Sequence, residues 1–237
     1  MRTLDDLIAA IRREAERAEF PIDRPVYEQA KKDPLDPILF AGTLSATTCV
    51  FGRDLGKDEV AAGEPLIGAG GRLVRSGVYE ASTGHPPDRS DKKLESALAL
   101  VVLTNTVPYK PPGNKAYTEG VKSRFRPLIA EFLVDHWRGN RLLSLGTEAF
   151  RWFAPFAEDS AAFDAFWARE DRYEAEIRVS VRVAADDLTS PPRSKTITLA
   201  PLPHPSPLNQ RWFGLFPGLL AARLAAVEPE SSEAKRR

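Results

Sequence analysis

The chain contains one cysteine, Cys49, and only three histidines among its 237 residues. A single thiol excludes an intramolecular disulfide and every zinc or iron–sulfur site that needs several cysteines. The few histidines, His85, His136 and His204, also disfavour a histidine-rich metal site. We therefore predict a protein without a metal ion or another cofactor. Cys49 lies in an apolar run, which favours a buried structural thiol.

Long apolar runs are also missing from the sequence. None approaches the length that is needed to span a bilayer. The N-terminal segment 1–18 carries acidic and basic residues where a secretory signal peptide needs a continuous apolar region. These two absences predict a cytoplasmic protein.

The chain has no excess of either charge, because lysine plus arginine and aspartate plus glutamate each number 33. This balance argues against an extended basic surface for nucleic acid. Residues 110–141 nevertheless contain more basic than acidic side chains. That window fits a local basic face, and it fits a solvated helix face equally well.

The residues that are present predict one α/β domain over residues 1–228. Hydrophobic residues make up 43% and charged residues 28%, as in a globular chain with a sizeable core. Strands and helices alternate with short connections, so we expect a central, mostly parallel sheet flanked by helices on both faces. The charged tail over 229–237 is typical of disorder. Apolar spacing predicts helices over 1–20, 121–137 and 212–227, the last of them interrupted by Pro217, and a helix opening at Arg72. It also predicts strands over 46–51, 97–103, 141–145, 173–183 and 196–199.

Three of the expected strands end in segments that are rich in polar or turn-forming residues. An apolar run that breaks abruptly into glycine is typical of a buried strand followed by a sharp turn. Such turns present backbone N–H groups and side chains at the sheet edge, where α/β proteins place their active sites. In chain order the segments are Gly52-Arg53-Asp54-Leu55-Gly56, Thr104-Asn105-Thr106-Val107 and His204-Pro205-Ser206-Pro207-Leu208.

Each of these segments also has a purely structural explanation. Asp54 could cap a turn, since aspartate is common in turns flanked by glycine. Asn105 could be an ordinary amide at the end of a buried strand. The prolines around Ser206 could form a rigid turn without any ligand. Taken singly, the segments do not identify a function.

Together and in this order, the three segments resemble the uracil-DNA glycosylase superfamily, and the similarity runs from about Val50 to Leu220. The segment from His204 to Leu208 is similar to the motif of the common bacterial and eukaryotic enzymes. Two others, Gly63-Glu64-Pro65-Leu66-Ile67-Gly68 and Pro111-Pro112-Gly113-Asn114, are similar to motifs of the iron–sulfur branch. The resemblance implies an α/β domain of the uracil-DNA glycosylase type.

The sequence departs from both branches at several positions. Tyr109 stands where the iron–sulfur branch has a cluster cysteine, so no cluster is expected. Leu66 replaces the aromatic residue that stacks on the target base in relatives, which affects the preference for uracil. Asp54 agrees with the Gly-Gln-Asp-Pro type, but Arg53 replaces the preceding Gln or Glu. The chain therefore looks like a member between known branches.

The resemblance implies a role for each matched residue. Asp54 would be the catalytic anion, and His204 would donate a hydrogen bond to the base O2. The amide of Asn105 would read the base edge, because it can donate and accept at once. The flipped base would contact Gly52, Leu66, Asn105 and His204, while DNA would contact Lys110, Lys115, Pro205, Ser206, Pro207, Leu208, Asn209 and Arg211.

By resemblance, the protein is a monomeric, monofunctional DNA repair glycosylase that flips and excises uracil or a related deaminated base. No lysine occupies a motif position for a Schiff base, which disfavours a lyase. Leu66 and Arg53 favour an alternative, a damaged-DNA-binding protein of the same fold that does not release the base. A nucleotide-binding protein unrelated to repair would leave the order of the motifs unexplained. Glu59 could assist Asp54 or order its loop.

Overall fold

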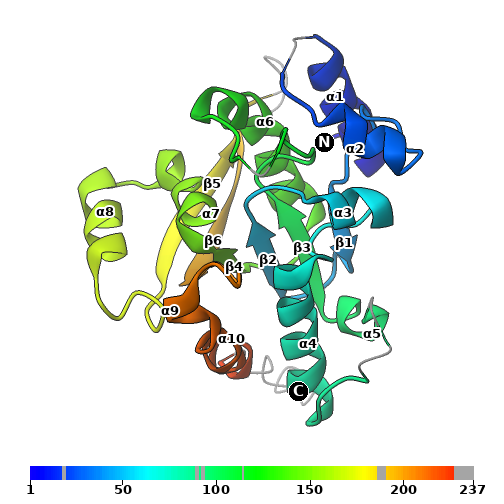
Figure 1. Ribbon diagram of the computed structural model, residues 1–237. Coiled ribbons are helices and arrows are strands. Elements are labelled where there is room, and N and C mark those ends of the chain that lie inside the picture. Colours follow the sequence, from blue (N-terminus) through cyan, green and yellow to red (C-terminus); the bar gives the residue numbers. More distant parts are fainter. Residues whose placement is uncertain (18–19, 89–90, 92–93, 114, 186–190, 227–237) are drawn as a thin grey trace, which may run out of the picture.

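A six-stranded sheet forms the centre of the part of the chain that the computed structural model describes, residues 1–17, 20–88, 91, 94–113, 115–185 and 191–226 (Figure 1). The tail predicted at 229–237 lies outside these residues. The strand order is β1-β3-β2-β4-β6-β5. The four inner strands are parallel, whereas β1 and β5 pair antiparallel at the two edges. The bounds are β1 Phe40–Gly42, β2 Thr48–Gly52, β3 Val101–Asn105, β4 Arg141–Leu145, β5 Ile177–Val183 and β6 Arg193–Leu202.

Helices cover both faces of the sheet, which confirms the predicted fold class. One face packs against α1 Leu4–Arg17, α3 Lys57–Ala62, α6 Glu119–Glu131, the π-helical turn Phe132–His136, α7 Gly146–Arg151 and α8 Ser160–Ala168. The other face packs against α4 Ala69–Thr83, α5 Glu95–Leu98 and α10 Phe216–Ala225. Shorter elements are α2 Arg24–Gln29, the 3₁₀ turn Ala154–Phe156 and α9 Gln210–Phe213. No described helix is long and apolar enough to cross a membrane.

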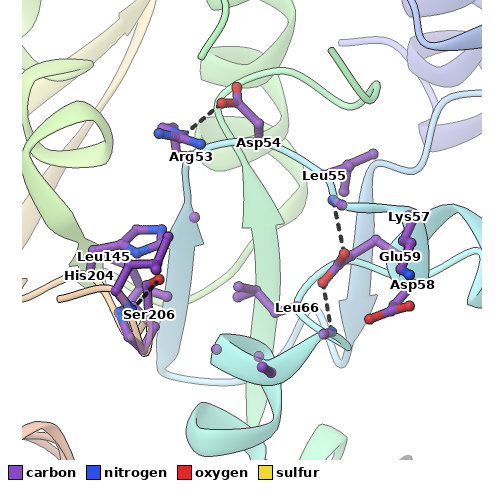
Figure 2. A pocket seen from close by; sticks show the side chains of 18 of the residues that line it. Arg53, Asp54, Leu55, Lys57, Asp58, Glu59, Leu66, Leu145, His204 and Ser206 are labelled. Carbon is purple, nitrogen blue, oxygen red and sulfur yellow. Dashed lines mark hydrogen bonds and ion pairs between the residues drawn. The ribbon is translucent and has the colours of Figure 1, made fainter. Parts of the chain in front are cut away.

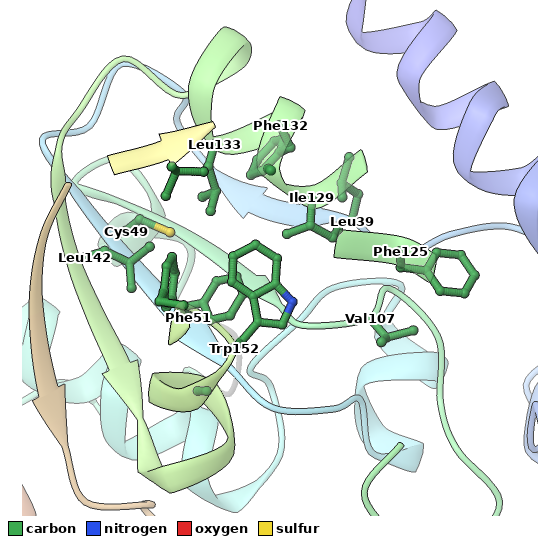
Figure 3. Packing of buried hydrophobic residues seen from close by; sticks show 14 of the residues in the cluster. Leu39, Cys49, Phe51, Val107, Phe125, Ile129, Phe132, Leu133, Leu142 and Trp152 are labelled. Atoms are coloured by element: carbon green, nitrogen blue, oxygen red, sulfur yellow. The ribbon is translucent and has the colours of Figure 1, made fainter. Parts of the chain in front are cut away.

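The alternation of side chains along each strand divides the core in two. Cys49 and Phe51 of β2 point into one cluster, while Val50 between them points into the other. The ring of Phe51 packs on Trp152 with centroids 5.0 Å apart, at the centre of the larger cluster (Figure 3). Cys49 is fully buried, and this burial raises the pKa of its thiol. The expectation of a structural thiol therefore holds.

Several predicted strand boundaries differ from the structure: the strands expected over 173–183 and 196–199 are observed at Ile177–Val183 and Arg193–Leu202. The apolar run 97–103 does not form one strand, because its first residues belong to helix α5 and the strand starts only at Val101. The Leu98 carbonyl accepts a hydrogen bond from the Thr43 N–H, which fixes the turn between these two elements. The predicted interruption of the closing helix at Pro217 is confirmed, because the helix is divided into α9 and α10 and Pro217 lies in the first turn of α10. The error at 97–103 arises because periodicity alone cannot separate a short helix from a strand in an apolar run.

The register of the parallel strands brings their carboxyl ends to one edge of the sheet. Gly52 is aligned with Asn105, and Leu145 of β4 is aligned with Leu202 of β6. The residues that follow β2 and β6 therefore emerge at the same edge of the sheet, on either side of β4, with Asn105 at the end of β3. This edge is where open α/β sheets bind their ligands.

Candidate active site

A cavity of about 770 Å³ opens at the carboxyl ends of the parallel strands. Its walls are the loop after β2, the start of α4 and the loop after β6 (Figure 2). Eight of the predicted site residues line it: Gly52, Asp54, Leu66, His204, Pro205, Ser206, Leu208 and Asn209. The structure thus gathers segments that lie about 150 residues apart in the sequence.

Three of the residues predicted to contact the base lie against one another. A Cβ atom placed on Gly52 would come 3.2 Å from Asn105 Nδ2 and 3.3 Å from a methyl carbon of Leu66. Asn105 is buried, and its Oδ1 atom has no hydrogen-bond partner within the described part of the chain. A buried acceptor without a partner is costly unless a ligand satisfies it. The glycine leaves room for such a ligand beside the amide.

Leu66 projects into the cavity from a backbone in the left-handed region, with φ of 54°. This conformation is unfavourable for leucine, so neighbouring contacts must hold it. Arg75 of α4 supplies them: its Nε donates to the Leu66 carbonyl at 2.8 Å, and Nη2 donates to the Pro65 carbonyl and to Glu64, both at 3.0 Å. Arg75 is 1% exposed. Sequence reasoning missed this residue, since nothing in the helical pattern of α4 marks an inward arginine.

Glu59 joins the two loops that form this wall. Its Oε2 accepts a hydrogen bond from the Gly56 N–H at 2.9 Å, and its Oε1 accepts from Ile67 at 3.0 Å and Gly68 at 2.8 Å (Figure 2). Three backbone donors therefore surround one buried carboxylate. Of the two roles open from the sequence, the structure supports the ordering of the loop.

Asp54 contributes to the cavity wall, but its carboxylate is turned inward. The side chain is 3% exposed, and its Oδ2 lies 2.7 Å from the Nε of Arg53. In Figure 2 the carboxylate points to Arg53 and away from Leu66. Burial raises the pKa of Asp54, while the charges of Arg53 and Lys122 and the backbone of Tyr117 oppose this rise. The sequence could place Asp54 at the sheet edge but could not orient its side chain.

His204 stands on the other side of the cavity, two residues beyond β6, and is exposed to solvent on one side. Gly146, with φ of 83°, allows this approach, because a Cβ atom there would lie 2.9 Å from the His204 Cβ. The His204 carbonyl accepts hydrogen bonds from the Ser206 N–H at 2.9 Å and from Asn209 Nδ2 at 3.1 Å, which fold the loop back. Desolvation, and then the charge of Arg53, lower the pKa of His204. A neutral imidazole is therefore favoured at pH 7.

The residues expected to contact DNA fall into two groups. Lys115, Pro207, Leu208 and Arg211 are exposed, and Leu208 is 94% exposed at the tip of its loop. Pro205 is buried, and Ser206 and Asn209 are partly buried. The exposed residues are accessible to a large ligand.

Lys110 does not fit its predicted role as a phosphate contact. Its side chain is 4% exposed, and Nζ donates to Asp23 at 2.6 Å and to the carbonyls of Pro111 at 3.0 Å and Gly113 at 2.7 Å. The ammonium is thus enclosed by three oxygens. It fixes the turn that follows β3 and is unavailable at the surface.

Residues 40–228 match the family model described as the uracil DNA glycosylase superfamily. The chain belongs to this superfamily. The match covers the whole sheet and the segments from which the resemblance was inferred. No curated protein sequence matches the chain significantly.

Superfamily membership gives the site its general chemistry. The superfamily consists of DNA glycosylases, which are DNA-binding hydrolases of DNA repair. Among the described residues, no group of three or more His, Cys, Asp or Glu side chains is placed to hold a metal ion. The charged and titratable residues that line the cavity are Arg53, Asp54, Lys57, Asp58, Glu59 and His204, and the amide of Asn105 lies against Gly52.

Proposed function

We propose that this protein is a monofunctional glycosylase that hydrolyses the N-glycosidic bond of uracil, or of a related deaminated base, in DNA. It would act as a monomer in the cytoplasm and without a metal ion. One observation carries this proposal: Gly52, Asp54, Leu66 and His204 line one cavity, and the amide of Asn105 lies against Gly52. The carboxylate of Asp54, the imidazole of His204 and the amide of Asn105, whose Oδ1 has no partner in the described residues, therefore lie around the same cavity.

The reaction requires opposite charges at its two ends. As the glycosidic bond breaks, positive charge develops on the sugar and negative charge on the base. The ionised Asp54 carboxylate stabilises the sugar cation, and its burial strengthens this effect because the local dielectric is low. A neutral His204 donates a hydrogen bond to the base O2 as that oxygen becomes anionic. Asn105 can donate to O4 and accept from N3–H of uracil.

The target base must leave the duplex before it can enter the cavity, at a cost of a few kcal/mol. Leu208 is suited to occupy the space that the base leaves, because it is apolar and 94% exposed. The neighbouring loop residues Pro205, Ser206 and Pro207 would press on the phosphates. Lys115 and Arg211 would position the strand through phosphate contacts.

Leu208→Ala tests this assignment. We expect the free energy of unfolding to change by less than ~0.5 kcal/mol, because an exposed side chain makes few contacts. Uracil release from duplex DNA should fall about 10-fold, the equivalent of ~1.4 kcal/mol. Release from single-stranded DNA, which needs no wedge, should change little. Leu215→Ala is the matched control, since Leu215 is also exposed and lies in the following turn. An equal loss on both DNA forms would contradict the wedge.

The activity itself can be tested with labelled oligonucleotides that carry uracil or hypoxanthine, single-stranded or opposite each base. Alkali cleaves the strand wherever a base has been released. We expect cleavage with the wild-type protein, and its rates rank the substrates. Binding of free nucleotides without binding of oligonucleotides would contradict a role in repair.

A second function is supported by the inward carboxylate of Asp54, which is 3% exposed and paired with Arg53. A protein that recognises a damaged base without releasing it needs no accessible anion. In that case, the same oligonucleotides would show a gel shift with the uracil-containing strand, but alkali treatment would give no cleaved product.

A further inference from the structure

Arg53 occupies the space between the two groups that the proposed chemistry uses. Its Nε lies 2.7 Å from Asp54 Oδ2, and its side chain is 31% exposed whereas that of Asp54 is 3% exposed. In Figure 2, Arg53 lies at the end of β2, with Asp54 on one side and His204 below it. Arg53 is also the charged residue that acts on His204. One guanidinium therefore influences both groups.

The other charged and titratable groups around Asp54 cannot replace Arg53. Lys122 of α6 acts on Asp54, but its Nζ is hydrogen bonded to Glu148 of α7, which offsets its charge. Tyr117, before α6, contributes through its backbone, and its buried hydroxyl has no hydrogen-bond partner in the described residues. Arg53 alone makes an ion pair with the Asp54 carboxylate in the described part of the chain.

We infer that Arg53 is a positioning residue whose single charge keeps Asp54 ionised and His204 unprotonated during base release. This inference rests on the proposed function. Desolvation in the cavity favours the neutral forms of the buried Asp54 and of the more exposed His204, which suits His204 but opposes ionisation of Asp54. The fixed positive charge of Arg53 lowers the pKa of Asp54, because it stabilises the carboxylate. It also lowers the pKa of His204, because it disfavours a second cation nearby. Arginine suits this task since it stays charged at every relevant pH.

The sign of the effect leads to a specific pH dependence. Burial raises the pKa of Asp54, and Arg53 counteracts this rise. Burial lowers the pKa of His204, and Arg53 lowers it further. Removal of the Arg53 charge should therefore raise the pKa of both groups. Protonated Asp54 lacks the charge that the sugar cation needs, so the higher pKa of Asp54 reduces activity on the acidic side.

The test compares Arg53→Gln with Arg53→Lys in single-turnover release of uracil over a range of about pH 5 to 9. For Arg53→Gln, we expect the acidic limb of the rate profile to move up by about 1 to 2 pH units. Arg53→Lys retains the charge, so its limb should stay near that of the wild type even if the rate is lower. A uniform fall of the Arg53→Gln rate at all pH values, with an unmoved limb, would overturn the inference. Faster release by Arg53→Gln would also overturn it, because Arg53 would then only cover Asp54.

A second measurement does not depend on catalysis. The chain has three histidines, so their ring C–H resonances can be followed by NMR, and His204→Gln identifies that of His204. We expect the midpoint of the His204 titration to rise in Arg53→Gln and to stay in place in Arg53→Lys. An unmoved midpoint would refute the effect of Arg53 on His204. If the wild type releases no base but the midpoint moves, the proposed function fails while the electrostatic role of Arg53 stands.

Discussion

Asp54→Asn and His204→Ala should each slow single-turnover uracil release by about 10²- to 10³-fold, the loss typical of a group that stabilises charge in a transition state. Asn keeps the shape of Asp54 but removes the negative charge that the proposed mechanism uses to stabilise the sugar cation. Ala at position 204 removes the donor to the base O2. The rates are measured by alkali-revealed cleavage with enzyme in excess, so that product release does not mask the chemical step.

Asp58→Asn is the control for the loss of a negative charge near the cavity. Asp58 lines the same cavity, but its exposed side chain lies in the first turn of α3. A solvated carboxylate has little influence on the reaction, so the rate should change less than about 3-fold. If Asp58→Asn were as slow as Asp54→Asn, general electrostatics and not the position of Asp54 would explain the loss.

Thermal unfolding shows whether a slow Asp54 variant is still folded. The pKa of Asp54 is raised in the folded state by burial, so the folded protein favours the protonated side chain. Protonation of Asp54 therefore stabilises the folded protein. This stabilisation is complete at pH values below the pKa of Asp54 in the unfolded chain, and it is lost as the pH rises through the pKa of Asp54 in the folded protein. We expect Asp54→Asn to be at least as stable as the wild type at neutral pH. A lower melting temperature would mean that the pairing with Arg53 outweighs the cost of burial.

The sequence was sufficient to predict the end of the sheet at which the site lies. Abrupt endings of apolar runs, at Gly52 and before His204, are local features, and parallel pairing then brings them together. The order of the segments identified the superfamily that the family model confirms. Fold class and family were therefore predictable because they depend on patterns within single segments.

Side-chain orientation was not predictable, because it depends on partners far away in the chain. Lys110 is buried by Asp23, which precedes it by 87 residues. Asp54 turns inward beside the adjacent Arg53, into surroundings to which Lys122 and Tyr117 contribute from a distant part of the chain. The apolar residues before Val101 satisfied the pattern of a strand but formed a helical turn. In each case tertiary contacts outweighed local preference.

Arg75→Met should lower the free energy of unfolding by about 3 kcal/mol, although methionine fills much of the same volume. The guanidinium of Arg75 donates to the carbonyls of Leu66 and Pro65 and to Glu64. Its removal leaves buried acceptors without donors. Urea unfolding followed by tryptophan fluorescence measures the change. Arg17→Met is the control: Arg17 is an exposed arginine of α1, and its loss should cost less than ~0.5 kcal/mol.

The same variant should also affect base release, because Arg75 holds Leu66 at its unfavourable φ of 54°. Without that hydrogen bond, Leu66 can relax to an ordinary backbone conformation and withdraw from the cavity wall. We expect uracil release to fall about 10-fold at temperatures where the variant remains folded, a loss of ~1.4 kcal/mol. Arg75→Lys separates the two effects of the arginine, since lysine keeps the charge but lacks the planar fork that reaches two carbonyls and a carboxylate. If the fork matters, Arg75→Lys should resemble Arg75→Met. Recovery of stability and activity by lysine would instead show that the charge beside Glu64 is sufficient.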